Sequence, residues 1–191
     1  MDIVEDIKGY VIDQINIYKE KSDDNYDFWN QHIKFVYYEA IDLAEEYKAD
    51  LEIVKLGALL HDIALICEVG SRKNHHINGA KLADEILTKY SYPEEKKKRV
   101  LGCVINHRSS KNATNIEETC VADADIIAHF DNLPMVLKYA FEIEKVDLNT
   151  INDWIKNSFE DEYNDLSPKT KEKFKDRYDT ICSVLIDDKK N

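Results

Sequence analysis

Glycine and proline are scarce in this sequence, with five and three among 191 residues. Turns depend on these residues, so we expect few, long elements, and these should be helices. No apolar run approaches the ~18 residues that a membrane-spanning helix needs. The first residues also lack the basic and apolar regions of a signal peptide. We therefore expect a cytoplasmic protein without a membrane partner.

Paired cysteine motifs and a positive charge are missing too. None of the four cysteines has CxxC spacing, so reduced, buried thiols are expected in place of disulfides or a zinc cluster. A net charge of −12 argues against sequence-independent binding to long nucleic acid, which requires many phosphates to be neutralised. It does not exclude a small phosphorylated ligand held by a local basic pocket or by metal ions.

Apolar residues recur at helical spacing along most of the chain. They predict helices over about 1–21, 27–48, 51–65, 75–90, 93–107, 116–130, 134–145, 148–163 and 168–187. No strand pattern exceeds a few residues, and no linker or repeat is present. We predict one all-α domain over 1–191, a bundle of about eight or nine helices. Its core would occupy about 27–131, and helices over about 134–187 would cover that core.

A histidine and an aspartate stand inside one of the most apolar stretches, Ala58-Leu59-Leu60-His61-Asp62-Ile63-Ala64. A buried carboxylate without a partner costs several kcal/mol, so buried charges are paired or bind a metal. The pair His61-Asp62 is therefore a candidate metal site. A hydrogen bond between the two side chains within the core is the alternative.

Other metal-binding side chains occupy comparable positions on the neighbouring helices. His32 shares an apolar stripe with Val36 and Ala40, and Asp123 and Asp125 lie in the apolar run 121–128. Three more histidines, His75, His76 and His107, stand at helix ends. Each helix from the second to the sixth thus supplies a member, and the set can converge on one centre. Imidazole with carboxylate suits Mn, Fe, Co, Ni, Zn or Mg.

This order of residues resembles the HD-domain phosphohydrolase superfamily, whose core motif is H…HD…D on a helical bundle. The resemblance covers about residues 27–131. It implies that His32 is the first histidine, that His61 and Asp62 form the HD pair, and that Asp125 or Asp123 is the last ligand. Helical spacing does not separate the two aspartates. Asp125 is favoured because similar members with a D-x-D segment use the second carboxylate.

Some members of this superfamily add two histidines that hold a second metal ion. His75 stands four residues before Gly79, in the H-x-x-x-G pattern of such members, with His76 as its alternative, and His107 matches the second position. The resemblance implies Asp62 as a bridge between two ions. Alternatively, these three histidines face solvent or donate to substrate beside a single ion.

The implied activity is hydrolysis of a phosphate monoester, nucleotide or small phosphodiester by a metal-bound hydroxide, with Asp62 and His61 as catalytic residues. The cofactor would be one or two divalent ions of Mn, Fe, Mg, Co, Ni or Zn. Cations in the polar loops 70–74 and 108–112 are candidate phosphate contacts, Arg108 first and then Lys73, with Arg72 and Lys111 beside them. The alternative for each is an exposed loop cation. A di-iron oxygenase of the same fold and a non-catalytic metal- or nucleotide-binding module are the alternatives. The substrate and the oligomeric state have no signature in the sequence.

Overall fold

Every regular element in the computed structural model is helical over the residues that it describes, 2–22 and 26–185. The all-α prediction is thereby confirmed. In chain order the elements are α1 (Ile3–Lys21), a π-helical turn η1 (Trp29–Ile33), α2 (Lys34–Tyr47), α3 (Leu51–Leu60), α4 (Ile63–Ile66), a 3₁₀ turn η2 (Arg72–Asn74), α5 (His75–Lys89), α6 (Glu94–Asn106), a 3₁₀ turn η3 (Ser110–Asn112), α7 (Ile116–Asp131), α8 (Leu133–Glu142), α9 (Ile151–Asp165) and α10 (Pro168–Leu185).

Side-chain caps explain where several helices begin. Asp50 caps α3, since its Oδ1 accepts hydrogen bonds from the backbone N–H groups of Glu52 and Ile53. Asp2 and Asn115 cap α1 and α7 in the same way. Each cap satisfies amide groups that have no partner inside the helix.

The predicted helix over 51–65 is divided in two, which corrects the sequence-based boundary. α3 ends at Leu60, and Asp62 has φ −104° and ψ 15° before α4 begins. The carbonyl of Ala58 accepts a hydrogen bond from Nδ1 of His61 at 2.8 Å. The break lies at the two most polar residues of a buried segment, and it turns both side chains toward the neighbouring helices.

Two further boundaries differ from the predictions. α8 ends at Glu142, before the left-handed residue Lys145 (φ 55°). α9 begins at Ile151, because Asp147 accepts hydrogen bonds from the backbone of Asn149 and Thr150 and forms a turn where a helix was expected. The predicted end of the last helix, at about residue 187, lies outside the described residues.

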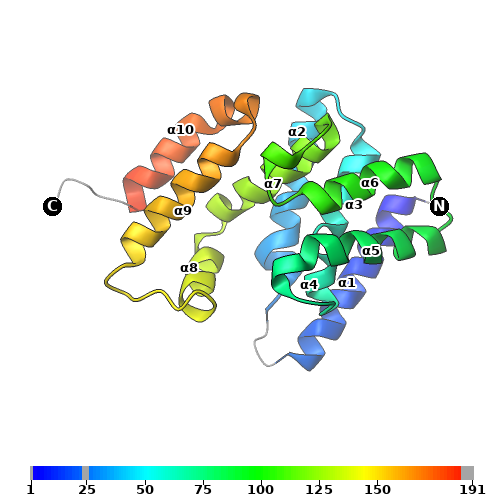
Figure 1. Cartoon of the computed structure of the whole chain (residues 1–191), viewed down its shortest axis with the longest axis horizontal. Coiled ribbons are helices and arrows are strands. Elements are labelled where there is room, and N and C mark those ends of the chain that lie inside the picture. The colour runs from blue at the N-terminus through cyan, green and yellow to red at the C-terminus, as the bar shows by residue number, and fades with distance from the viewer. Residues whose placement is uncertain (1, 23–25, 186–191) are drawn as a thin grey trace.

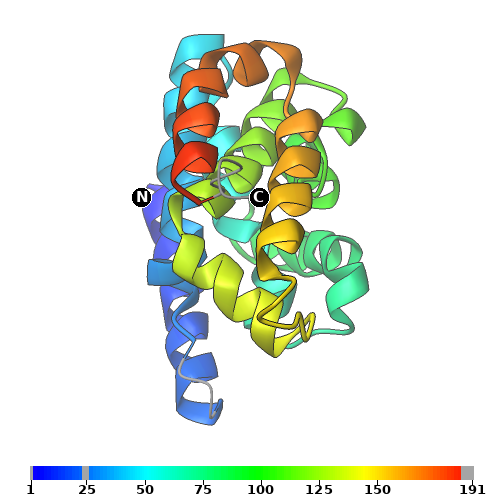
Figure 2. The same cartoon turned by 90° about the vertical axis from the view of Figure 1, so that its left-hand side faces the viewer.

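The helix α7 runs through the middle of the molecule (Figure 1). On one side it packs against α2, α3 and α6, and on the other it contacts α8, α9 and α10. These last three helices lie over one face of the rest and face the viewer in Figure 2. Consequently α7 is buried on nearly all sides, including Cys120, Val121, Ala124 and Ile127.

The described helices include none long and apolar enough to cross a membrane. All four cysteines are free, and Cys103 and Cys120 are buried while Cys67 and Cys182 are partly exposed.

Candidate metal centre

Four side chains from η1, the α3–α4 break and α7 meet in the core. The Nε2 atoms of His32 and His61 are 3.1 Å apart. Oδ1 of Asp125 lies 3.0 Å from Nε2 of His32 and 3.7 Å from that of His61. Oδ2 of Asp62 lies 3.7 Å and 3.6 Å from the same two nitrogens. Two nitrogens and two carboxylate oxygens therefore surround one point, and we call these four residues the first group.

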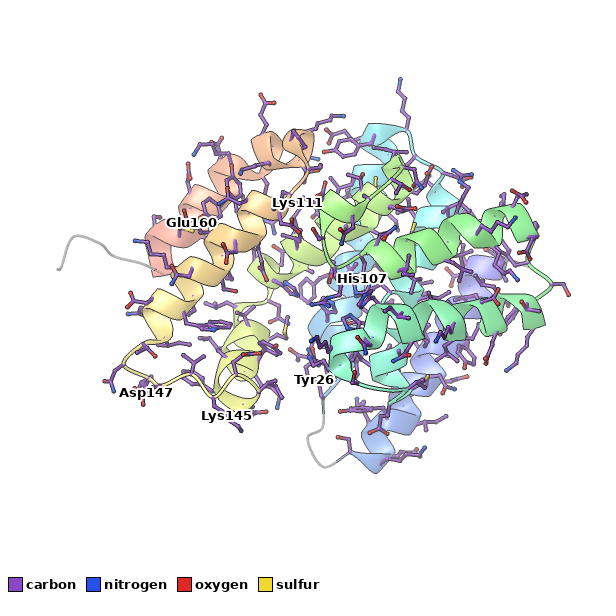
Figure 3. All side chains as sticks on the ribbon, in the orientation of Figure 1. Tyr26, His107, Lys111, Lys145, Asp147 and Glu160 are labelled. Carbon is purple, nitrogen blue, oxygen red and sulfur yellow. The ribbon has the colours of Figure 1, made fainter. Side chains whose placement is uncertain are left out.

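A second group shares Asp62 with the first. Oδ1 of Asp62 lies 3.2 Å from Nε2 of His75 and 3.9 Å from Nε2 of His107. The two histidine nitrogens are 2.9 Å apart. His107 comes from the end of α6 and lies near the middle of the molecule in Figure 3. Asp62 thus presents one oxygen to each group.

Backbone carbonyl groups orient three of these imidazole rings. Nδ1 of His61, His75 and His107 lies 2.7–2.8 Å from the carbonyl oxygen three residues earlier in each case. Each histidine stands at or just beyond a helix terminus. The contact directs Nε2 toward the centre, as is usual for histidines that bind metals.

A glycine allows α5 to come close to the centre. A Cβ atom on Gly79 would lie 3.4 Å from the carbonyl oxygen of His61 and 3.3 Å from the side chain of Val104. These distances are at or inside ordinary van der Waals contact. The small residue therefore lets α5 approach both His61 and α6, and this packing brings His75 to Asp62.

The facing histidine nitrogens have a chemical consequence. A carbonyl group has no hydrogen to donate, so Nδ1 carries the proton in His75 and in His107. In the neutral rings each Nε2 then presents a lone pair, and the two face each other at 2.9 Å. Two lone pairs at this distance repel each other unless a cation lies against both. The second group could therefore hold a proton or a metal ion between these two nitrogens.

Both carboxylates of the centre favour the ionised form. Burial alone would raise the pKa of Asp62, but the surrounding imidazoles, above all His61 and His75, hold that pKa well below its usual range. Burial likewise opposes ionisation of Asp125, and the contact with His32 and the charge of His61 outweigh it and lower its pKa. Each residue therefore has the charge that a metal ligand needs.

The two histidines of the second group differ in their affinity for a proton. Burial and the neighbouring His61 lower the pKa of His107 to about 4, so this ring is neutral near pH 7. Burial opposes protonation of His75 too, but its contact with Asp62 outweighs burial and raises its pKa. His75 is therefore the histidine from which an incoming metal ion would displace a proton.

Asp123, the alternative to Asp125, lies away from both groups. Its two oxygens accept hydrogen bonds from the hydroxyl groups of Ser110, Ser167 and Thr170 and from the backbone N–H of Ser167, all within 2.9 Å. It is fully buried. Asp123 thus joins the loop after α6 to the start of α10.

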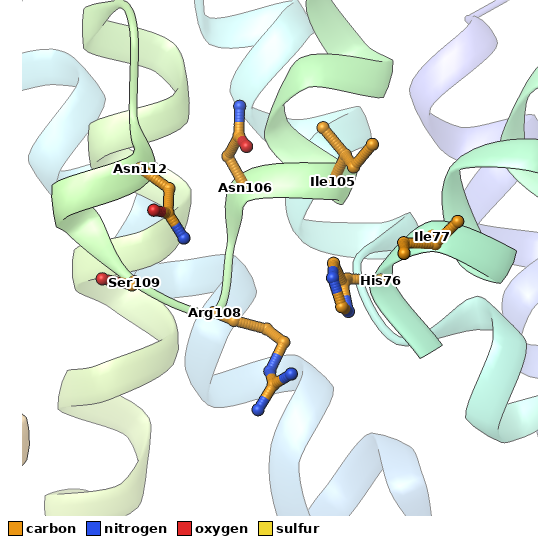
Figure 4. Close-up of a pocket in the computed structure, with 7 residues that line it drawn as sticks. All are labelled: His76, Ile77, Ile105, Asn106, Arg108, Ser109 and Asn112. Carbon is orange, nitrogen blue, oxygen red and sulfur yellow. The ribbon is translucent and has the colours of Figure 1, made fainter. Parts of the chain in front are cut away.

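His76, the alternative to His75, also lies outside the two groups. It lines a pocket of about 460 Å³ on the outer side of the ends of α5 and α6, together with Ile77, Ile105, Asn106, Arg108, Ser109 and Asn112 (Figure 4). Burial and the positive charge of Arg108 lower its pKa. The pocket adjoins the second group, since Asn106 and Arg108 flank His107 and His76 follows His75.

The four candidate phosphate contacts are in different situations. Arg108 is exposed beside the pocket, and its Nη1 donates to the carbonyl of Lys73 at 3.2 Å. The guanidinium of Arg72 stacks over the ring of Tyr139 at 5.1 Å, and Nζ of Lys111 lies 3.0 Å from Oδ1 of Asp165. Arg72 and Lys111 thus have an aromatic ring and a carboxylate against their charged ends, whereas Arg108 contacts a neutral backbone carbonyl.

The sequence-based interpretation left out His129, and the structure places it at the centre. Its ring stacks on that of His32 with centroids 5.5 Å apart and 16° between the planes. Its Nδ1 lies 3.0 Å from Oε1 of Glu162 in α9. Although burial opposes it, the negative charge of Glu162 raises the pKa of His129 to about 9. The covering helices thus contribute an acidic residue to the surroundings of the centre. The spacing of four between Asp125 and His129 was the signal available for this position.

Comparison with known proteins shows what this chain is similar to. A family model of the HD domain matches residues 30–129. Ribonuclease Y of Treponema denticola is 39% identical over 98 residues, which are 51% of this chain and 18% of the ribonuclease. The similarity thus spans less than a fifth of the length of that protein.

Two solved structures share the fold. An HD-superfamily hydrolase from Bacillus thuringiensis superposes with a TM-score of 0.68 at 20% identity, over 95% of this chain and 94% of that one. An HD superfamily hydrolase from an uncultured Thermotogales bacterium gives a TM-score of 0.65 at 19% identity, over 95% and 88% of the two chains. At such identities the likeness concerns the fold, and it extends beyond the family match to the covering helices.

Proposed function

The chain belongs to the HD domain family, and on that premise we propose that it is a metal-dependent phosphohydrolase. Its substrate would be a phosphate monoester, a nucleotide or a small phosphodiester. The observation that carries this proposal is the pair of donor groups that meet at Asp62. A carboxylate with one oxygen toward each of two histidine pairs is suited to two cations side by side.

Buried atoms without partners test whether a metal fits there. Oδ1 of Asp62 and Oδ1 of Asp125 are buried, and neither has a donor with hydrogen-bond geometry, although a histidine nitrogen lies within 3.2 Å of each. Such atoms are costly to bury unless they bind something. Nitrogen and oxygen donors of this kind suit Mn, Fe, Co, Ni, Zn or Mg. The residues present therefore fit a divalent ion.

We assign one ion to the first group and a second to Asp62, His75 and His107. A divalent ion held by these residues would lower the pKa of bound water and polarise a phosphoryl oxygen. Asp62 and His61 are the residues on which both the ligand set and catalysis would depend. His61 is fully buried, and the lowered pKa of Asp62 keeps its carboxylate ionised at neutral pH.

Arg108 would bind the phosphoryl group or its neighbour in the substrate. Its guanidinium is exposed, stands one residue beyond His107 and borders the pocket, which has room for part of a small ligand. Arg108→Ala should raise KM about tenfold, the loss of about 1.4 kcal/mol, with a smaller change in kcat. Lys111→Ala is the matched control and should change KM less than about twofold, since Asp165 already holds that cation.

Metal analysis of gently purified protein, followed by a substrate screen, tests the proposed function. The screen would compare aryl phosphate monoesters, aryl phosphodiesters, nucleotides and a short RNA with Mn, Mg, Co or Ni added. RNA belongs in it because the relative from Treponema denticola is a ribonuclease. We expect the wild-type chain to hydrolyse at least one of these substrates, and His61→Ala to lose both the metal and the activity. Unchanged activity in that variant would contradict the proposal.

Two further outcomes distinguish the alternatives. Iron in the purified protein together with oxygen consumption during turnover would identify an oxygenase. Nucleotide binding without turnover of any phosphoester would identify a binding module.

A further inference from the structure

His32 differs from the other three histidines of the centre in how its ring is held. Nδ1 of His61, His75 and His107 each contacts the carbonyl oxygen three residues earlier. For His32 that carbonyl belongs to Trp29, and it accepts the backbone N–H of Lys34 as the hydrogen bond of the π-helical turn. Nδ1 of His32 is buried and has no hydrogen-bond partner. The ring therefore lacks the contact that orients the other three.

One face of α7 contacts His32 and its neighbour Gln31 in place of the missing hydrogen bond to Nδ1. Asp125, His129 and Asn132 follow one another at spacings of four and three, so they lie on the same side of the helix. Asp125 meets the Nε2 atom of His32. His129 lies flat against the ring of His32, with 16° between the planes. Asn132, just beyond the helix, contacts the residue before His32.

Asn132 binds the π-helical turn itself. Its Nδ2 donates to the carbonyl oxygen of Gln31 at 2.6 Å and to Oε1 of the same residue at 3.2 Å. The side chain is 8% exposed, so these bonds are shielded from water. π-helical turns are rare and cost helical hydrogen bonds, so a side chain that binds their backbone helps to keep them. Asn132 thus anchors the backbone that carries His32.

Glu162 in turn fixes the plane of the His129 ring. Its Oε1 lies 3.0 Å from Nδ1 of His129, and both side chains are less than one third exposed. With this edge bound, the face of the His129 ring lies against the ring of His32, with 16° between the planes. A nitrogen of His129 also lies within 4.8 Å of donor atoms of His32 and Asp125, so a test must separate stacking from a ligand role.

We propose that His129 and Asn132 are positioning residues for His32, which together replace the missing hydrogen bond to its Nδ1 atom. His129 fixes the plane of the ring by stacking, and Asn132 fixes the backbone turn. This inference rests on the metal centre proposed above. It predicts that metal affinity in the first group depends on the shape of residue 129 and on a hydrogen-bond donor at residue 132.

The test measures Mn²⁺ affinity by calorimetric titration of the metal-free full chain. Variants would be made in the His107→Ala background, in which the second group is incomplete and the measured ion belongs to the first. His129→Ala should weaken Mn²⁺ binding by at least about tenfold, the scale of residues that orient metal ligands. His129→Phe keeps a flat ring without a nitrogen and should bind Mn²⁺ within about threefold of the background protein.

Substitution of Asn132 provides an independent test of the same proposal. Asn132→Asp keeps the size of the side chain and removes the donor, and it should weaken Mn²⁺ binding about as much as His129→Ala. Circular dichroism melting of each metal-free variant establishes that it is folded. If His129→Ala unfolds, the comparison of His129→Phe with the background protein still decides the role of the ring.

Each outcome has a definite meaning. If His129→Phe weakens Mn²⁺ binding as much as His129→Ala does, a nitrogen of His129 is needed, and the positioning role is overturned. Unchanged affinity in both His129→Ala and Asn132→Asp would overturn it too. Failure of the wild-type chain to bind any divalent ion would instead remove the proposed metal centre, and this inference with it.

Discussion

Two carboxylates on α7, the fully buried Asp123 and the largely buried Asp125, stand two residues apart and have opposite surroundings. Asp123 accepts four hydrogen bonds, from Ser110, Ser167 and Thr170. Asp125 faces His32 and His61 instead, and its Oδ1 atom has no donor with hydrogen-bond geometry. A buried carboxylate whose hydrogen bonds are complete stabilises the fold. One that lacks them is available to a ligand.

Substitution of Asp125 should have the largest effect on activity. Asp125→Ala removes a donor from the first group, and we expect hydrolysis to fall at least about 1000-fold, or about 4 kcal/mol in the activation barrier. Metal content should fall with it. Steady-state kinetics and elemental analysis measure the two. Activity within tenfold of the wild type would show that Asp125 is not a ligand.

Substitution of Asp123 should act on stability. Asp123→Ala leaves three hydroxyl groups and an amide without their acceptor, which should lower the free energy of unfolding by about 3–5 kcal/mol in urea titrations. Metal content and kcat per folded molecule should change little. Asp123→Asn is the matched variant, because its amide would oppose the donors at that site. Metal loss from a folded Asp123 variant would remove the distinction between the two aspartates.

A similar contrast exists between the adjacent histidines His75 and His76. His75→Ala should reduce the bound divalent ions from two to one, since Nε2 of His75 lies 3.2 Å from Asp62. His76→Ala should keep both ions, because His76 lines the outer pocket. Elemental analysis of both variants after dialysis gives the stoichiometry. A value of one in the wild-type chain would leave only the first group as a site.

The smallest expected effect concerns the ion pair of Glu162 with His129, and it depends on pH. The pKa of His129 is about 9 when folded and about 6.5 when unfolded. Because the folded pKa is raised, its stabilisation is complete below about pH 6.5 and is lost as the pH rises through about 9. Glu162→Gln should therefore destabilise the metal-free chain by about 1–2 kcal/mol at pH 6.

At pH 10 the free energy of unfolding of Glu162→Gln should differ much less from that of the wild type. Urea titrations at several pH values, with a chelator present, give the comparison. An effect of Glu162→Gln that stays constant from pH 6 to pH 10 would show that the charge of His129 does not contribute.

The sequence predicted most of the centre because its members are polar residues in apolar surroundings. His61 and Asp62 interrupt a buried helix, and His32 continues an apolar stripe. Helical spacing predicted that the helix faces carrying these residues turn toward the core. The structure confirms that His32, His61 and Asp62 are buried. Burial of charged or hydrogen-bonding groups is costly, so their positions indicated a shared partner.

Only the tertiary structure separated Asp123 from Asp125. Residues two apart on a helix point about 200° from each other. On a helix with one buried face, one of the two aspartates would lie in solvent, and the sequence pattern would show which one faces the core. α7 is buried on both sides, between the candidate metal centre and the C-terminal helices, so the apolar pattern is the same around each aspartate.

The contacts of Asn132 and Glu162 could not be predicted from the sequence for a related reason. They depend on the π-helical turn at 29–33 and on the docking of α9, neither of which has a local pattern. His129 had one signal, its spacing of four from Asp125. The sequence by itself determined an all-α fold and the polar residues of its core. The packing of distant helices on α7 decided which of these residues meet, because contacts between segments far apart in the chain leave no periodic signal within either segment.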